Sequence, residues 1–402
     1  MPFIMIASIF IILYIVYIIA GVLFYDLRLF DYIDEIYPWL LFILFFFSKK
    51  KFSKPFIIFL CVSIFYFIYS LYIIQSNVLV AICNDFIIEI KPFLTFFSLL
   101  CLRPVFTNKQ IILLKNVSLY SVTILVIVGI LHYGHNQTIR GEILTGAGYA
   151  LSCILIALSY YLFSKHDNNK VKVICILICA LGILRPTSKY IIEFACLLFL
   201  YYYINTRKQK KASKYILTSV LLVFSSYLIY DFIRDDMMYF VNDGAARGVL
   251  FATSFDILNS YVPFGSGLAS YATSASANWY SSIYAQFGID SIYGLADGET
   301  YFVSDTYFPV LAQFGYVGVF LFVIFICYVF KLAQKRYQYS NDSKTYRISL
   351  MILCIIVIES TSAATFIGNR TVLLMQLLAL TLYDIKKYSF SSANLKYRTF
   401  VP

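Results

Sequence analysis

Long apolar runs are the feature that most constrains what this chain can fold into. Of its 402 residues, 61% are hydrophobic and only 13% are charged, whereas an average soluble domain has about 25% charged residues. A helix needs about 20 mainly apolar residues to cross a bilayer. Apolar runs lie at residues 3–24, 36–47, 56–74, 86–102, 117–131, 143–163, 171–184, 190–204, 215–233, 308–330, 348–360 and 371–383. We therefore predict an all-α, polytopic membrane protein with about 12 transmembrane helices.

The basic residues predict how these spans are oriented. Short cytoplasmic loops of membrane proteins are rich in Lys and Arg. With the N-terminus in the cytoplasm, most of the 32 basic residues fall in cytoplasmic loops or in the C-terminal tail, together with only Asp167, Asp342 and Asp384 among the 21 acidic ones. We therefore expect both termini to be cytoplasmic. Topology also accounts for the net charge of +11, so a nucleic-acid partner is not expected.

The chain is expected to divide into three parts. Residues 1–230 form N-terminal transmembrane helices, residues 231–304 form one large outer loop between the ninth and tenth spans, and residues 305–402 form the remaining helices and a cytoplasmic tail. Long loops are often lids or binding elements. The aromatic side chains of this loop, Trp279 among them, suit a carbohydrate ligand, although they could equally form the loop's own core. A single large outer loop, placed between the ninth and tenth spans, does not divide the chain into two matching halves. This argues against a transporter of the major-facilitator type.

Cysteine and histidine give no sign of a metal site. The nine cysteines lie in or beside apolar segments, where a free cysteine behaves as a small buried hydrophobe. No Asp-x-Asp pair and no supported His/Cys cluster occurs in the sequence. We expect neither a metal ion nor another cofactor.

Several cations lie on the predicted outer side, against the positive-inside trend, and such residues need a partner or a use. A local ion pair is one interpretation: Lys189 and Glu193 are one helical turn apart. Taken as a set, the outer cations favour an anionic ligand, because guanidinium groups bind phosphate through a planar fork. They are Arg28, Lys91, Arg140, Arg185, Lys189, Arg234, Arg247 and Arg370.

Two stretches near the large loop carry more specific patterns. The first predicts a helix that starts near Arg247, a turn at Pro263 and a glycine-rich turn from Gly265 to Gly267. The second stretch covers residues 304–322. Asp305 and Tyr307 open the tenth span there, and the glycines of that span allow close helix approach. Asp305 is expected to cap that helix, either alone or in addition to a catalytic role.

The order of these motifs resembles the Wzy-type polysaccharide polymerases and the related O-antigen ligases. Arg140-Gly141-Glu142, Thr187-Ser188-Lys189 and the stretch from Asp85 to Pro92 match as well. Ligases usually have His-Asn where this chain has Ser304-Asp305, so the resemblance favours a polymerase variant.

The resemblance implies a GT-C-like membrane glycosyltransferase in the bacterial inner membrane. It would transfer a growing glycan from undecaprenyl pyrophosphate to a lipid-linked repeat unit at the outer, periplasmic leaflet, in O-antigen or capsule synthesis. Its partners would be undecaprenyl-pyrophosphate-linked glycans, the bilayer, and a chain-length regulator and flippase of the same pathway. An O-antigen ligase, or a flippase or transporter of lipid-linked sugar, remain the alternatives.

The expected chemistry assigns roles to individual residues. Arg247 and Arg140 would stabilise the departing pyrophosphate, and Asp305 would act as the base for the acceptor hydroxyl. Pyrophosphate is already a good leaving group, so the reaction requires no metal ion. The substrate-binding candidates are Lys189, Arg185, Arg370, Gly265, Gly267, Tyr307 and Trp279.

Overall fold

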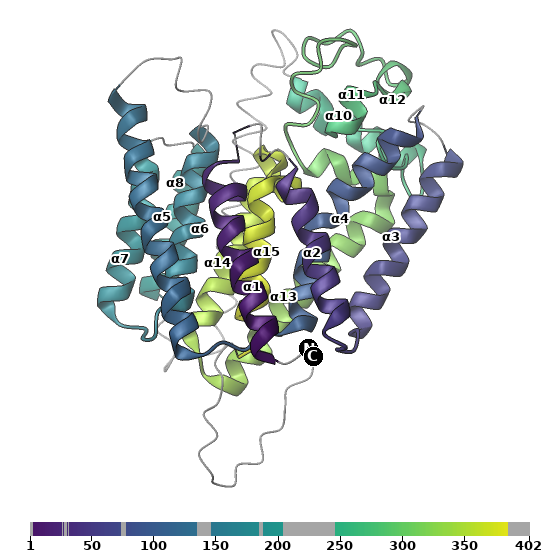
Figure 1. The fold of residues 1–402 in the computed structure, drawn as a ribbon. Coiled ribbons are helices and arrows are strands. Elements are labelled where there is room, and N and C mark those ends of the chain that lie inside the picture. The colour runs from purple at the N-terminus through teal and green to yellow at the C-terminus, as the bar shows by residue number, and fades with distance from the viewer. Residues whose placement is uncertain are drawn as a thin grey trace.

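The protein is helical throughout the part that the computed structural model describes, which comprises residues 3–25, 27, 30, 32–73, 78–134, 146–184, 188–203 and 246–384. No strand occurs among these residues, in which only Phe106, Ala296 and Glu299 are bridge residues. The expected all-α class is therefore confirmed. The helices stand side by side as a bundle (Figure 1), and residues 246–304 form a cap over one end of it.

The helices of the first half are α1 (Phe3–Val16), its π-helical continuation η1 (Tyr17–Leu23), α2 (Ile33–Phe47), α3 (Lys54–Ile73), α4 (Leu79–Leu102), α5 (Asn108–Gly134), α6 (Gly146–Phe163), α7 (Asn169–Ala180), the 3₁₀ turn η4 (Leu181–Leu184) and α8 (Ser188–Tyr203). Those of the second half are α10 (Ala246–Ser260), α11 (Ser274–Asn278), α12 (Ser282–Gln286), the 3₁₀ helix η5 (Phe308–Phe314), α13 (Gly315–Ser340), α14 (Ser343–Ser362), η6 (Ala364–Ile367) and α15 (Asn369–Thr381).

Each apolar run predicted from the sequence overlaps a helix, except for residues 215–233, which lie outside the described residues. Within the described part, four helical stretches are long and apolar enough to cross a membrane: Met5–Leu23, Lys54–Ile73, Asn108–Ile130 and Phe308–Ser340. The other helices are shorter or less apolar. The structure thus supports a membrane protein, and a total of about 12 spans stays a prediction.

Helix α15 lies at the centre of the bundle, packed against α4, α6 and α14. All its residues from Thr371 to Thr381 are buried. Its polar side chains bond across helices: the Tyr37 hydroxyl donates to Gln376 Oε1 at 3.1 Å, and the hydroxyls of Ser349 and Thr381 are 2.6 Å apart. Hydrogen bonds of this kind hold helices together where the surroundings offer no hydrophobic driving force.

Helices α3, α5 and α13 turn large apolar side chains outward. Ile58, Ile112 and Phe320 are 60%, 54% and 65% exposed, respectively. Apolar surface of this extent on a monomer marks an interaction surface, and on helices long enough to span a bilayer it fits lipid contact. The outward faces of these three helices therefore suit contact with lipid.

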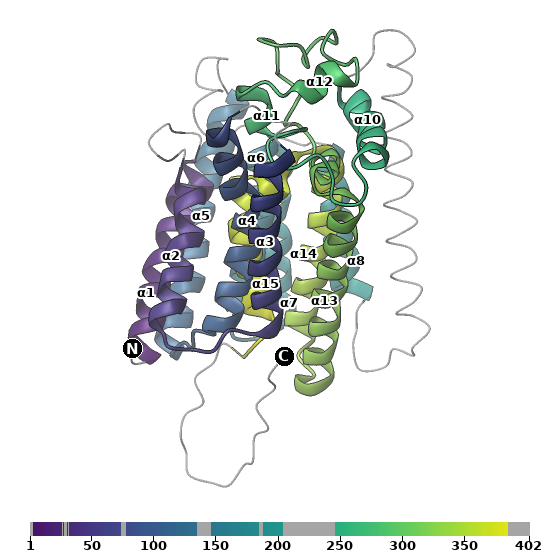
Figure 2. The same cartoon turned by 90° about the vertical axis from the view of Figure 1, so that its right-hand side faces the viewer.

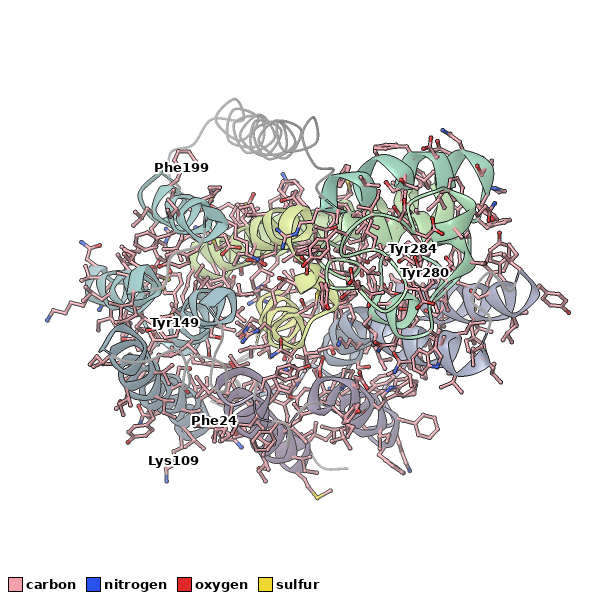
Figure 3. The ribbon with its side chains drawn as sticks, turned by 90° about the horizontal axis from the view of Figure 1, so that it is seen from above. Phe24, Lys109, Tyr149, Phe199, Tyr280 and Tyr284 are labelled. Carbon is pink, nitrogen blue, oxygen red and sulfur yellow. The ribbon has the colours of Figure 1, made fainter. Side chains whose placement is uncertain are left out.

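Residues 246–304, with α10, α11 and α12, lie across one end of the bundle (Figure 2). The rings of Tyr271 and Tyr284 stack at 5.8 Å, and those of Tyr280 and Tyr284 at 5.2 Å. Figure 3 shows Tyr280 and Tyr284 enclosed by this segment in the view from above. Of the two roles open to the loop aromatics, these three tyrosines take the role of a local core.

Candidate functional site

Arg247 and Asp305 meet at the junction between the cap and the bundle. The carboxylate Oδ2 accepts hydrogen bonds from Arg247 Nε at 2.9 Å and Nη2 at 2.6 Å. The side chains of Arg247 and Asp305 are 42% and 30% exposed. Arg247 is the second residue of α10, and Asp305 lies in the turns before η5. The helix cap expected of Asp305 is wrong, because the N-cap of η5 is Tyr307 and the carboxylate contacts Arg247 instead.

An aromatic ring forms one wall of this pair. The Arg247 guanidinium lies over the Phe302 ring, 5.9 Å from its centroid, within the range of a cation–π contact. Arg247 Nη1 has no hydrogen-bond partner among the described residues. The arrangement therefore offers a cation with a remaining donor, a carboxylate and an apolar face at a partly solvated boundary.

The two glycine motifs meet in a close contact between their backbones. Gly265 and Gly315 have φ values of +84° and +63°, and a Cβ on either one would run into the backbone of the other. The Gly267 amide donates to the Gln313 carbonyl at 3.0 Å. The predicted glycine-rich turn is thus present, and its function in the fold is to let the cap and the start of the last helices approach backbone to backbone.

Helix α4 holds the loop that follows these glycines. Asp85 Oδ2 accepts a hydrogen bond from the Ala269 amide at 2.6 Å, and Ser70 Oγ of α3 accepts one from the Leu268 amide at 2.8 Å. Helix α4 begins at Leu79, so Asp85 lies inside the helix rather than ahead of a span. The stretch from Asp85 to Pro92 was singled out in the sequence as a motif only, and the structure assigns Asp85 a partner.

An apolar cavity of about 350 Å³ lies between α3, α4 and α13. Tyr307 and Glu89 both line it. Tyr307 is 2% exposed and its ring lies 4.7 Å from that of Phe366. Glu89 is buried, and its Oε1 has no hydrogen-bond partner within the described part of the chain. Sequence reasoning missed Glu89, although a carboxyl group in an otherwise apolar stretch was a usable signal.

Lys189 pairs with Glu359 of α14, 2.7 Å from its Oε2. The pair expected within α8, Lys189 with Glu193, is not the one that forms. Thr365 of η6 also donates a hydrogen bond to Glu359. Glu193 is fully buried, and neither of its oxygens has a hydrogen-bond partner among the residues described. Lys189 therefore neutralises one of two neighbouring carboxyl groups.

Arg370, at the start of α15, donates from Nε to Ser152 Oγ at 3.2 Å and from Nη1 to Asn369 Oδ1 at 3.3 Å. Its guanidinium covers Gly148, where any side chain would collide with it. The preceding turn, η6, links the apolar cavity to the Lys189–Glu359 pair. Its Phe366 ring packs on Tyr307, which lines the cavity, and its Thr365 hydroxyl donates a hydrogen bond to Glu359.

The remaining predicted residues have different outcomes. Lys91 forms an ion pair with Asp34 and is buried. Trp279 is partly buried against the small cluster that contains Leu268 and Ala275. Arg140 and Arg185 lie outside the described residues, as do Arg28 and Arg234. Of the predicted catalytic residues, the structure brings Arg247 and Asp305 into contact.

The chain was compared with known proteins. No protein-family model matches it, and no curated protein matches it. A function for the chain therefore has to be inferred from its residues and their geometry.

Proposed function

We propose that the chain is a membrane glycosyltransferase that polymerises lipid-linked oligosaccharide repeat units. It would transfer a growing glycan from undecaprenyl pyrophosphate to an incoming lipid-linked repeat unit at the outer leaflet of the bacterial inner membrane, through a bundle of about 12 spans. The cap of residues 246–304 would then face the periplasm. The chemistry needs a cation for the departing pyrophosphate and a base for the acceptor hydroxyl.

The contact between Arg247 and Asp305 carries this proposal. A cation and a carboxylate share one partly exposed site, with the guanidinium Nη1 directed at no described protein group. The site lies where the capping segment meets the apolar bundle, as a substrate with a glycan and a lipid tail requires. An ion pair that served only stability would be a weak device here, since exposed pairs contribute about 0–1 kcal/mol.

The pair also suggests how the base is released. A pyrophosphate that binds Arg247 competes with Asp305 for the same guanidinium, because both are oxyanions with fork-compatible geometry. Once displaced, the carboxylate is free to accept the proton of the acceptor hydroxyl. The acceptor oxygen then bonds to the anomeric carbon, and the bond from that carbon to the pyrophosphate oxygen breaks. Arg247 stabilises the charge that develops on the leaving group.

The direct test is a reaction with purified full-length protein and a chemically defined lipid-linked repeat unit. A ladder of product lengths on a gel supports polymerisation. Transfer only to a lipid A core acceptor identifies a ligase, and movement of the lipid-linked sugar across vesicles without a covalent product identifies a transporter. Either of the last two results overturns the proposal.

A further inference from the structure

A second cavity, of about 510 Å³, lies at the opposite end of the bundle from the cap. It is formed where α5, α6, α13, α14 and α15 have their ends. Its charged lining consists of Lys115, Lys165, Arg336, Lys344, Asp167, Asp342 and Asp384. The positive-inside pattern of the sequence predicts that this end is cytoplasmic.

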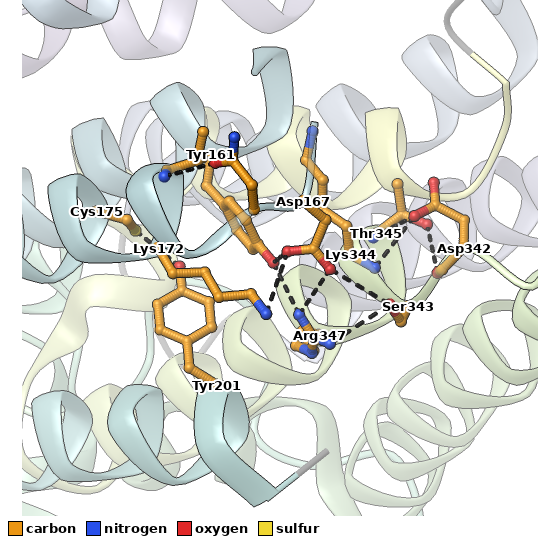
Figure 4. Close-up of polar contacts among 12 residues, drawn as sticks. Tyr161, Asp167, Lys172, Cys175, Tyr201, Asp342, Ser343, Lys344, Thr345 and Arg347 are labelled. Carbon is orange, nitrogen blue, oxygen red and sulfur yellow. Dashed lines mark hydrogen bonds and ion pairs between the residues drawn. The ribbon is translucent and has the colours of Figure 1, made fainter. Parts of the chain in front are cut away.

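Two of the carboxylates in the lining are already occupied by the protein itself. Asp167 accepts hydrogen bonds from Tyr161 at 2.7 Å and from Arg347 at 3.0 Å, with Lys172 at 3.6 Å, as Figure 4 shows. Asp342 caps α14 through the backbone amides of the following residues. Asp167 is therefore offset by Arg347 and Lys172, which lie outside the lining. The rest of the lining holds four cations against two carboxylates, Asp342 and Asp384.

The lysines are in a different situation. Lys344 Nζ donates to the carbonyls of Leu162 and Ser164 at 2.8 and 2.6 Å and so caps the end of α6. No hydrogen bond or ion pair joins Lys115 or Lys165 to another residue in the part that the structure describes. Two ammonium groups at the rim of one cavity thus lack a protein counter-ion there.

Tyr383 adds an independent sign of a ligand. It lines the cavity and is 8% exposed, and its hydroxyl is buried without a hydrogen-bond partner among the described residues. A buried hydroxyl without a partner costs about 1–3 kcal/mol. An oxyanion in the cavity would accept that hydrogen bond, as well as those of the two lysines.

The rest of the lining is apolar. Ile111, Ile112 and Leu380 contribute to the wall, and Ile112 is 54% exposed on the outward face of α5. The cavity therefore continues from charged groups onto a surface that suits acyl chains. This combination matches a molecule with a phosphate and a hydrophobic tail better than it matches a free anion.

We propose that this cavity binds the phosphate headgroup of an anionic phospholipid, with Lys115, Lys165 and Tyr383 as its donors. The site is distinct from the Arg247–Asp305 pair and does not depend on glycosyl transfer. Basic pockets between transmembrane helices at this side of a membrane are suited to such headgroups.

The test measures binding of fluorescent phosphatidylglycerol and of fluorescent phosphatidylcholine to the delipidated full-length protein in neutral detergent. We expect phosphatidylglycerol to bind more tightly and millimolar inorganic phosphate not to displace it. The double variant Lys115→Gln/Lys165→Gln should weaken phosphatidylglycerol binding about 30-fold. Tyr383→Phe, which removes only one oxygen atom, should weaken it several-fold.

The matched control is Lys170→Gln/Lys331→Gln, which removes the same charge from exposed lysines outside the cavity. It should leave the affinity unchanged. Equal loss in both double variants, equal binding of the two lipids, or displacement by inorganic phosphate would each overturn the proposal. A thermal unfolding curve for each variant separates lost binding from lost folding, and Tyr383→Phe provides a second measurement if the lysine variant unfolds.

Discussion

Arg247 and Asp305 lie 58 positions apart in the chain, yet the guanidinium of one holds a single carboxylate oxygen of the other through two nitrogens. The second carboxylate oxygen, Oδ1, is left out of this contact. A fork-to-fork pair would use both oxygens. The geometry instead leaves both partners with unused capacity, which is what a site that exchanges its internal partner for a substrate requires.

Replacing either member of this pair should abolish polymer formation. Arg247→Ala and Asp305→Asn should each lower the rate by about 100-fold or more, because each removes a group that acts on developing charge. The measurement is the rate of ladder formation from a lipid-linked repeat unit, at protein levels matched by immunoblot.

The reversed pair, Arg247→Asp with Asp305→Arg, separates chemistry from structure. It should restore thermal stability, because the two charges still attract each other, but not activity. Recovery of the ladder in the reversed pair would show that Arg247 and Asp305 have only a structural role.

The close backbone contact between Gly265 and Gly315 predicts that a substitution at Gly265 lowers stability more than one at an open glycine. Gly265→Ala should lower the free energy of unfolding by about 3 kcal/mol, because the new Cβ meets both a positive φ and the backbone at Gly315. Gly288→Ala is the control: its φ is +67° but it has open space around it, so about 1 kcal/mol is expected. Thermal unfolding in detergent measures both, and equal losses would contradict the role of this contact.

The helices and turns were predictable because their signals are local. The apolar runs overlap helices, and the turn that includes Pro263 and Gly265 needs residues that tolerate unusual backbone angles. Local rules also predicted a cap at Asp305 and a pair between Lys189 and Glu193. Both expectations were wrong, because partners distant in the chain compete for the same groups.

Those distant partners left no local pattern in the sequence. Glu359 is 170 positions from Lys189, and it reaches the lysine because α8 packs against α14. Glu89 does stand out locally as a carboxyl group in an apolar stretch, but nothing near it in the sequence indicates that Tyr307 lines the same cavity. The sequence therefore shows which ionisable groups cost free energy to place in a membrane. Which of these groups contact one another is decided by the fold.

The Asp167 cluster at the basic end predicts how stability depends on pH. Burial opposes ionisation of this carboxyl, but the hydrogen bond from Tyr161 and the charges of Arg347 and Lys172 outweigh it and hold its pKa below the usual 3.8. A carboxylate with a lowered pKa stabilises the folded state above its ordinary pKa, and that contribution is lost as the pH falls through the folded-state value.

Asp167→Asn should therefore destabilise the protein at pH 7, by about 3 kcal/mol, because Arg347 is buried and loses its counter-ion. The difference from the unmodified protein should shrink below pH 3.8. Melting curves from pH 7 to pH 3 measure it, with the exposed Glu299→Gln as control. A difference that stays constant across this range would contradict the assignment.

Amide substitution of the two carboxyl groups near Lys189 should affect stability to very different extents. Glu359→Gln leaves the partly buried Lys189 without its counter-ion, so a loss of about 3 kcal/mol is expected. Glu193→Gln should change stability by less than about 1 kcal/mol, because no ion pair joins Glu193 to a described residue and the amide can still face the Glu359 carboxylate as a donor. The two single variants differ only in which carboxyl is replaced, so each is the control for the other in thermal unfolding. A larger loss for Glu193→Gln would mean that Glu193, and not Glu359, is the counter-ion of Lys189.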